Sequence, residues 1–180
     1  MILLVGASAS GKTALSLILR KDFGLIKTVT YTTRKPRINE IDGVDYNFVS
    51  EEVFKAMDQD HDFVETTNYN GNHYGSAKKD ISDNKVLIVD PFGLKAYKSL
   101  NNPSIVSFYL NANEATRVAR MKERRDSDES IASRILNDEK VFTETVKKSC
   151  DFLIETENKS LEAIAQEVYR KYKETIETRK

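Results

Sequence analysis

The segment GASASGKT, residues 6–13, holds the first residues whose types and spacing could do chemistry. It matches the pattern G-x-x-x-x-G-K-[ST], in which glycines let backbone N–H groups turn inward on a polyphosphate. In that chemistry Lys12 reaches the outer phosphates, and the hydroxyl of Thr13 can ligate Mg²⁺. The alternative is a turn built of small residues. We predict a triphosphate site made by Gly6, Ala7, Ser8, Ala9, Ser10, Gly11, Lys12 and Thr13.

A second group of cations, Arg34, Lys35 and Arg37, surrounds Pro36 in a chain with no net charge. Three like charges so close repel one another, so we expect an anion to hold them. The alternative is a solvated charged loop. Guanidinium groups bind phosphate oxygens in pairs and stay charged, which suits Arg34 and Arg37 to clamp a phosphate. The Asn-Lys-x-Asp element with which GTPases usually read guanine does not occur in the sequence.

Apolar patterns predict the elements that position these groups. Ile2 to Val5 is an apolar run ending at a glycine, which is typical of a buried parallel strand. After the phosphate loop, Leu15 and Leu19 recur at helical spacing, and Gly24 ends the pattern. A strand, a glycine loop and a helix in this order turn the positive end of the helix toward a bound anion.

The rest of the chain alternates strands and helices, with one interruption. Residues 28–80 are rich in Thr, Tyr, Asn and Gly, so we expect an insertion with its own small sheet and a helix near 50–57. Strand patterns return at 86–90, 104–110 and 151–155. The second and third of these strands are separated by a polar helix at 113–125 and by one long amphipathic helix from Ile131 through Phe142 to Val146. A C-terminal helix follows the last strand. This order predicts an α/β fold with a mostly parallel central sheet between helices.

Composition narrows the class of protein. A length of 180 residues suits a single domain. Lys+Arg and Asp+Glu are both 28, so no global field points to nucleic acid or to a membrane surface. The single cysteine, Cys150, fits a reducing compartment, and no apolar run reaches the roughly 18 residues of a spanning helix. We expect a cytoplasmic protein with no nucleic-acid, membrane or obligatory protein partner.

Residues 30–50, TYTTRKPRINEIDGVDYNFVS, resemble the nucleotide-monophosphate-binding segment of guanylate kinases, roughly T-[ST]-R-x-P-R-x-x-E-x-x-G-x-x-Y-x-F. The similarity continues in FVE at 63–65, GNHYGS at 71–76 and RMKERR at 120–125. It covers nearly the whole chain. It implies a P-loop three-layer α/β fold with a core at about 1–28, 81–114 and 136–180. A GMP-binding insertion with a small mixed sheet would take up about 29–80, and a short helical lid about 115–135.

The resemblance also implies roles for single residues. The acceptor phosphate would be held by two arginines and two tyrosine hydroxyls, and guanine by a carboxylate and two hydroxyls: Arg34, Arg37, Tyr46, Tyr74, Glu65, Thr30 and Ser76. The catalytic set would be Lys12, Arg34, Asp90 and the lid arginines Arg120, Arg124 and Arg134. For the lid arginines the alternative is an exposed basic helix paired with Glu123 and Asp126. Thr13 and Asp90 would serve Mg²⁺, although Ile88 stands where the family usually has a first aspartate.

The predicted activity is ATP-dependent transfer of a phosphoryl group to GMP, and to dGMP, by direct in-line attack with Mg²⁺ as cofactor. One alternative is a catalytically silent interaction module of the same fold, against which the intact phosphate loop argues. Another is a P-loop kinase for a different phosphorylated acceptor, against which Glu65 with Thr30 and Ser76 argues.

Overall fold

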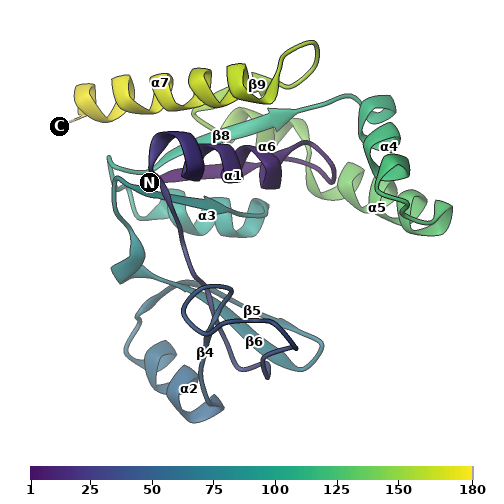
Figure 1. Ribbon diagram of the computed structural model, residues 1–180. Helices are drawn as coiled ribbons and strands as arrows, with labels where there is room; N and C mark the ends of the chain where they lie inside the picture. The colour runs from purple at the N-terminus through teal and green to yellow at the C-terminus, as the bar shows by residue number, and fades with distance from the viewer. Residues whose placement is uncertain (180) are drawn as a thin grey trace.

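The computed structural model describes residues 1–179, in which two sheets and their helices are arranged as Figure 1 shows. The elements are, in chain order, β1 Ile2–Val5, α1 Lys12–Phe23, β2 Ile26–Lys27, β3 Tyr31–Thr32, β4 Asn47–Phe48, α2 Glu51–Gln59, β5 Phe63–Tyr69, β6 Asn72–Ala77, η1 Lys78–Asp80, β7 Lys85–Ile88, α3 Pro91–Ser99, β8 Val106–Asn111, α4 Glu114–Glu123, α5 Asp128–Val141, α6 Glu144–Ser149, β9 Phe152–Glu155 and α7 Leu161–Arg179.

The central sheet has the order β2-β7-β1-β8-β9, and all of its strands run parallel. Alternate residues of β1 face opposite sides, so Ile2 and Leu4 pack with α1 and α7, while Leu3 and Val5 pack with α3. The sheet is thus buried between two helical layers, which confirms the predicted α/β architecture (Figure 1).

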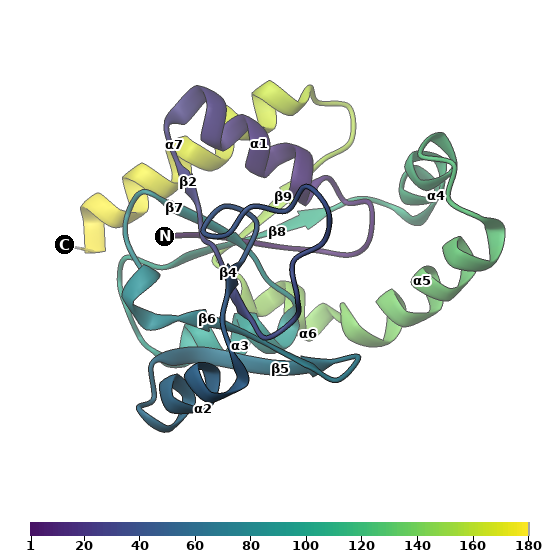
Figure 2. The same ribbon diagram turned by 60° about the horizontal axis from the view of Figure 1, so that its bottom comes forward.

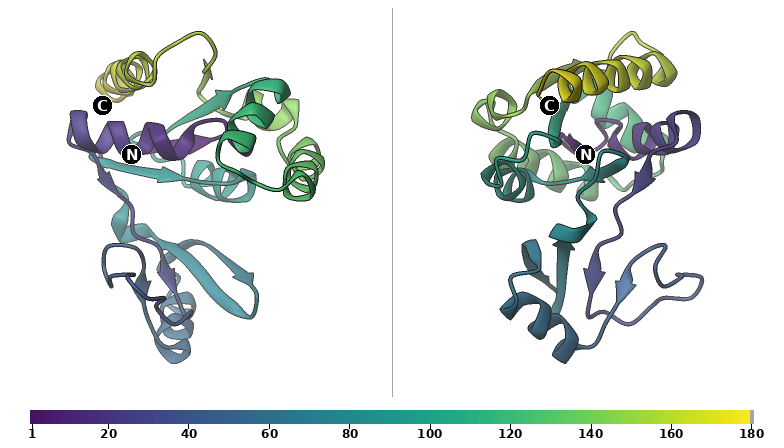
Figure 3. Two further views of the ribbon diagram at one scale, coloured as in Figure 1. Left: turned by 45° about the vertical axis from the view of Figure 1, so that its right-hand side comes forward. Right: turned by 90° about the vertical axis from the view of Figure 1, so that its left-hand side faces the viewer.

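The insertion forms a second sheet of order β4-β3-β6-β5 with both parallel and antiparallel pairs. Its small core consists of Phe54 from α2 with Phe63 and Ala77. Gly75 faces the same side, because an added Cβ would lie 2.9 Å from the Phe63 ring. Successive residues of β6 face opposite sides, so Tyr74 and Ser76 project from the other face of this sheet. Figure 3 shows the second sheet lying apart from the core. One chain segment leads from the core into this sheet, and another leads back to the core.

The long amphipathic helix predicted from Ile131 through Phe142 to Val146 is wrong, because the structure has two helices there. α5 ends at Val141, and Phe142 takes the non-helical angles φ −98° and ψ 63°. Thr143, in an extended conformation, is the N-cap of α6. The break lets Phe142 and Val146 pack against the core face that contains Tyr109. A helical pattern cannot reveal such a break when both halves carry apolar residues at helical spacing.

Among residues 1–179, no helix combines the length and the apolar composition needed to cross a membrane.

Candidate active site

The loop between β1 and α1 curls tightly at the carboxyl end of the central strand. Gly6 has φ +148°, and an added Cβ there would lie 2.6 Å from the carbonyl oxygen of Leu110. Gly11 has φ +104° and precedes the first residue of α1, with no side chain capping the helix. The unsatisfied N–H groups at this helix end therefore face outward, where an anion can bind them.

Lys12 folds back over the same loop. Its Nζ donates to the carbonyl oxygens of Gly6 and Ala7, at 2.5 and 2.8 Å. Burial lowers the pKa of Lys12 to about 8, while Asp138 raises it and Arg117 lowers it further. The ammonium group is thus held at the loop by weak carbonyl acceptors that a phosphate could replace.

A buried carboxylate anchors the phosphate loop from α5. Asp138 accepts from the backbone N and the Oγ of Ser8, at 2.9 and 3.1 Å. Its Oδ2 also accepts from Nη1 of Arg117 at 2.7 Å, and both charged side chains are buried. Sequence reasoning missed Asp138 and Arg117, which lie in polar stretches whose charged residues are expected to face solvent.

We expect Asp138→Asn to lower the free energy of unfolding by about 1.5–3 kcal/mol, because asparagine offers no charge and one acceptor oxygen to three donors. Urea unfolding of the purified variant measures this loss. The matched control is Asp126→Asn, which removes a more exposed pair with Arg134 and should cost about 0–1 kcal/mol. Equal losses in the two variants would show that Asp138 does not anchor the loop.

The three lid arginines occupy different positions. Arg120 of α4 reaches the phosphate loop and donates to the carbonyl oxygens of Ala9 and Thr156, at 3.1 and 3.4 Å. Arg134 instead pairs with Asp126 at 3.4 Å, and Arg124 at the end of α4 is exposed. Of the three, Arg120 is the one that makes a hydrogen bond to the loop, while the charge of Arg124 also lowers the pKa of Lys12. Figure 2 shows α4 and α5 together at one side of the core.

The cations of the insertion gather around one carboxylate. Nη2 of Arg34 pairs with Glu40 at 2.8 Å, and the backbone N of Arg37 donates to the other Glu40 oxygen at 2.7 Å. The hydrogen bond from Arg34 lowers the pKa of Glu40. Arg34 also lies over the ring of Tyr46, at 5.3 Å, and the rings of Tyr46 and Tyr74 are 6.0 Å apart. Glu40 thus supplies an anion to this cluster, and sequence reasoning gave it no role.

Glu65 and Ser76 are cross-strand partners on β5 and β6. A bulge between Phe63 and Glu65 shifts the register, so that Glu65 shares the face of Ser76 rather than that of Phe63. Ser76 Oγ donates to Glu65 Oε1 at 2.7 Å. Burial raises the pKa of Glu65, the bond from Ser76 lowers it, and the charge of Asp90 raises it.

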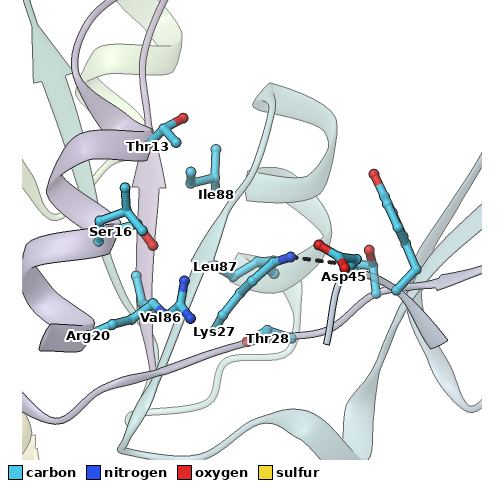
Figure 4. A pocket seen from close by; sticks show the side chains of 12 residues that line it. Thr13, Ser16, Arg20, Lys27, Thr28, Asp45, Val86, Leu87 and Ile88 are labelled. Carbon is cyan, nitrogen blue, oxygen red and sulfur yellow. Dashed lines mark hydrogen bonds between the residues drawn. The ribbon is translucent and has the colours of Figure 1, made fainter. Parts of the chain in front are cut away.

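A cavity of about 310 Å³ lies between the core and the insertion (Figure 4). α1 and β7 contribute Thr13, Arg20 and Ile88 to its lining, and the insertion side contributes Thr30 and Tyr46. Lys27 bridges the two sides by donating to the carbonyl oxygen of Asp45 at 3.1 Å. The end of the phosphate loop and part of the insertion therefore face one space, whereas Arg34, Arg37 and Glu65 do not line it.

The chain supplies few metal ligands here. In the part of the chain that the structure describes, no cluster of three His, Cys, Asp or Glu side chains is placed to hold a metal ion. Thr13 is exposed at the start of α1, and Asp90 is exposed while its Oδ1 caps α3 through the N–H of Gly93, at 2.8 Å. Ile88 offers no oxygen. One hydroxyl and one carboxylate fit a Mg²⁺ ion that is held mainly by substrate phosphates and water.

Comparison with known proteins agrees with this architecture. Residues 1–177 match the family described as Guanylate kinase. A guanylate kinase of Trichodesmium erythraeum is 30% identical over 174 residues, 92% of this chain and 91% of that protein. One of Fusobacterium nucleatum is 29% identical over 167 residues, 83% of this chain and 90% of that protein. The crystal structure of guanylate kinase from Anaplasma phagocytophilum covers 97% of this chain and 85% of its own, with a TM-score of 0.59 and 23% identity. The chain therefore belongs to the guanylate kinase family.

Proposed function

We propose that this protein transfers the terminal phosphoryl group of ATP to GMP, giving ADP and GDP. The observation that carries the proposal is the shared cavity, because Thr13 at the end of the phosphate loop lies across it from Thr30 and Tyr46 of the insertion. A donor and an acceptor nucleotide bound on its two sides would bring their phosphates together. The proposal extends to dGMP, since none of the contacts assigned below involves the ribose 2′-hydroxyl.

On the donor side, backbone N–H groups of residues 6–13 and the helix end would hold the phosphates of ATP. Lys12 would exchange its two carbonyl acceptors for phosphate oxygens. Arg120 already lies at the loop, and closure would bring Arg124 and Arg134 toward the transferred group, where cations stabilise the spreading negative charge.

On the acceptor side, the phosphate of GMP would displace Glu40 from Arg34 and draw in Arg37. The hydroxyls of Tyr46 and Tyr74, which flank this cluster, would donate to the same phosphate. Glu65 would accept from the guanine N1–H and 2-amino groups, with Thr30 and Ser76 nearby. Asp90 would lie between the base site and the transferred group.

The reaction needs no covalent enzyme intermediate. Held in line, an oxygen of the acceptor phosphate attacks the terminal phosphorus of ATP, and the bond to the bridging oxygen of ADP breaks. A Mg²⁺ ion near Thr13 and Asp90 would neutralise charge on the donor phosphates when bound. The chain's own contribution is to orient both phosphates and to exclude water.

A coupled assay of ADP formation with Mg-ATP and a panel of nucleoside monophosphates tests this function. Turnover that depends on GMP supports it. ATP binding without turnover on any acceptor would instead favour a silent interaction module, and preference for another acceptor would contradict the assignment of GMP.

We also propose that residues 29–80 and 115–135 swing toward the core when both nucleotides bind. Arg34 and Arg134 are paired with carboxylates of their own segments here, and they can reach a transferred phosphate only if the segments move. Small-angle scattering should show a smaller radius of gyration with an inhibitor that joins adenosine and guanosine through phosphates. An unchanged radius would contradict the closure.

A further inference from the structure

Tyr97 is a buried tyrosine at the junction between the core and the insertion. It lies on α3 and is completely buried, and Val64 of β5, the residue before Glu65, packs against the cluster to which Tyr97 belongs. β5, whose bulge turns Glu65 toward the face of Ser76, also contacts α3, the helix that carries Tyr97.

The hydroxyl of Tyr97 has an unmet hydrogen-bonding capacity. It is buried, and among residues 1–179 no group forms a hydrogen bond with it that satisfies both the distance and the angle of a normal bond. Burial raises the pKa of Tyr97 to about 12, a side-chain hydrogen-bonding interaction with Ser76 lowers it, and the charges of Glu65 and Asp80 raise it. The phenol thus keeps its proton at neutral pH. Ser76 is the cross-strand partner of Glu65, and Glu65 follows Val64, which packs against the cluster of Tyr97, so the Ser76 hydroxyl is the partner that this packing places beside Tyr97. A buried donor without a closed hydrogen bond is costly, so a native one calls for an explanation.

We propose that Tyr97 is a positioning residue that donates to Ser76 Oγ and so fixes the Ser76 hydroxyl as a hydrogen-bond donor toward the guanine base. A hydroxyl has one proton to give and two lone pairs to accept with. If the proton of Tyr97 occupies a lone pair of Ser76, the proton of Ser76 must point elsewhere. In this structure it points to Glu65 Oε1, and guanine O6 would replace that acceptor when the base binds.

This inference rests on the proposed function and adds a second element of base selection. Guanine carries N1–H and the 2-amino group, which suit Glu65, and its O6 acceptor is next to N1. Adenine carries an amino group where guanine has O6. A Ser76 hydroxyl that must donate fits O6 and leaves the adenine amino group without an acceptor, so Tyr97 would favour guanine without touching it.

Asp80 is the competing partner for Tyr97. Its Oδ2 is also buried without a hydrogen bond among the described residues, and its charge acts on Tyr97. A bond from Tyr97 to Asp80 would stabilise the segment leading out of the insertion and would have no bearing on the base. Base selectivity therefore separates the two partners.

The test compares Tyr97→Phe with wild type on GMP, IMP and AMP. IMP keeps O6 and N1–H but lacks the 2-amino group. We expect KM to rise about tenfold for both GMP and IMP, with kcat within about twofold. AMP use should be unchanged or higher, because the Ser76 hydroxyl is then free to accept from the adenine amino group. The ratio of KM for GMP to KM for IMP should stay constant, because the 2-amino group binds Glu65 and not Ser76. Thermal stability should change little, because the variant loses the bond from Tyr97 to Ser76 but also removes a buried hydroxyl whose hydrogen-bond geometry is incomplete in this structure.

The matched control is Tyr172→Phe, which removes another buried phenol from the core. The Tyr172 hydroxyl accepts from the N-terminal ammonium of Met1 and donates to the carbonyl oxygen of Asp83 at 2.8 Å, so this variant should melt at a lower temperature with acceptor ratios unchanged. An equal effect of Tyr97→Phe on GMP, IMP and AMP, or no effect, would overturn the proposal. So would Asp80→Asn if it reproduced the pattern of Tyr97→Phe.

Equilibrium binding of GMP, IMP and AMP by calorimetry gives the same ratios without turnover. A wild type that binds but does not phosphorylate GMP would contradict the proposed function, while the binding ratios of Tyr97→Phe still decide the role of Tyr97.

Discussion

Replacing Lys12 with methionine is expected to lower the rate of phosphoryl transfer by about 10²-fold or more while leaving the chain folded. Lys12 contacts two carbonyl oxygens of its own loop, so it holds little of the core together. Its charge is needed where the terminal phosphoryl group of ATP gains negative charge. Steady-state rates with Mg-ATP and GMP measure the loss of phosphoryl transfer, and circular dichroism of the purified variant shows whether the chain is folded. A folded variant with near wild-type turnover would show that the loop does not bind the donor phosphates.

The same lysine should make ATP binding depend on pH. In the free protein burial lowers the pKa of Lys12 to about 8, and a bound polyphosphate would raise it. The ammonium form predominates below pH 8 and is lost as pH rises through that value, so ATP affinity should fall by up to about tenfold per pH unit above 8. Calorimetry of ATP binding at pH 7, 8 and 9 measures this, and Lys12→Met should remove the dependence between pH 7 and 9.

Local patterns were sufficient to predict the parallel central sheet and the strand, loop and helix that open the chain. β1 could be predicted because Ile2 to Val5 are all apolar and a glycine follows them at the point where the chain must turn. α1 could be predicted because Leu15 and Leu19 lie one turn apart and pack on the sheet. These features arise from contacts within a strand, a turn or a helix, which sequence spacing records directly.

Contacts between distant segments could not be predicted in this way. Ser8 and Asp138 are 130 positions apart, and the polar surroundings of Asp138 favour an exposed carboxylate. The role proposed for Tyr97 depends on a bulge in β5 and on the packing of α3 against that strand. The break after Val141 depends on where Phe142 finds a partner, the ring of Tyr109, on another element. In each case the deciding interaction is tertiary, and the local pattern is compatible with more than one outcome.

Acceptor specificity is the second large effect that we expect, and it depends on Glu65. An ionised carboxylate that faces guanine gains two charge-assisted hydrogen bonds, each worth about 1.5–3 kcal/mol. AMP has no donor at those positions and places its N1 acceptor against the carboxylate. Sites of this kind reject the wrong partner by roughly 10⁴-fold, and IMP, which keeps N1–H alone, should fall between GMP and AMP. The measurement is kcat/KM for the three acceptors.

Two variants separate recognition of the base from recognition of the phosphate. Glu65→Gln keeps the shape of the side chain but removes its charge and one acceptor. The variant should therefore lower kcat/KM for GMP and reduce the ratio of kcat/KM for GMP to that for AMP. Arg37→Ala is the control. Because every monophosphate presents the same phosphate, kcat/KM should fall by about the same factor for all three acceptors. Ser76 and Glu65 are joined at 2.7 Å, so Glu65→Gln also changes the acceptor of the Ser76 proton, and the loss should exceed that of Tyr97→Phe. A wild type that used AMP as well as GMP, or a Glu65→Gln variant with the wild-type ranking, would show that this carboxylate does not read guanine.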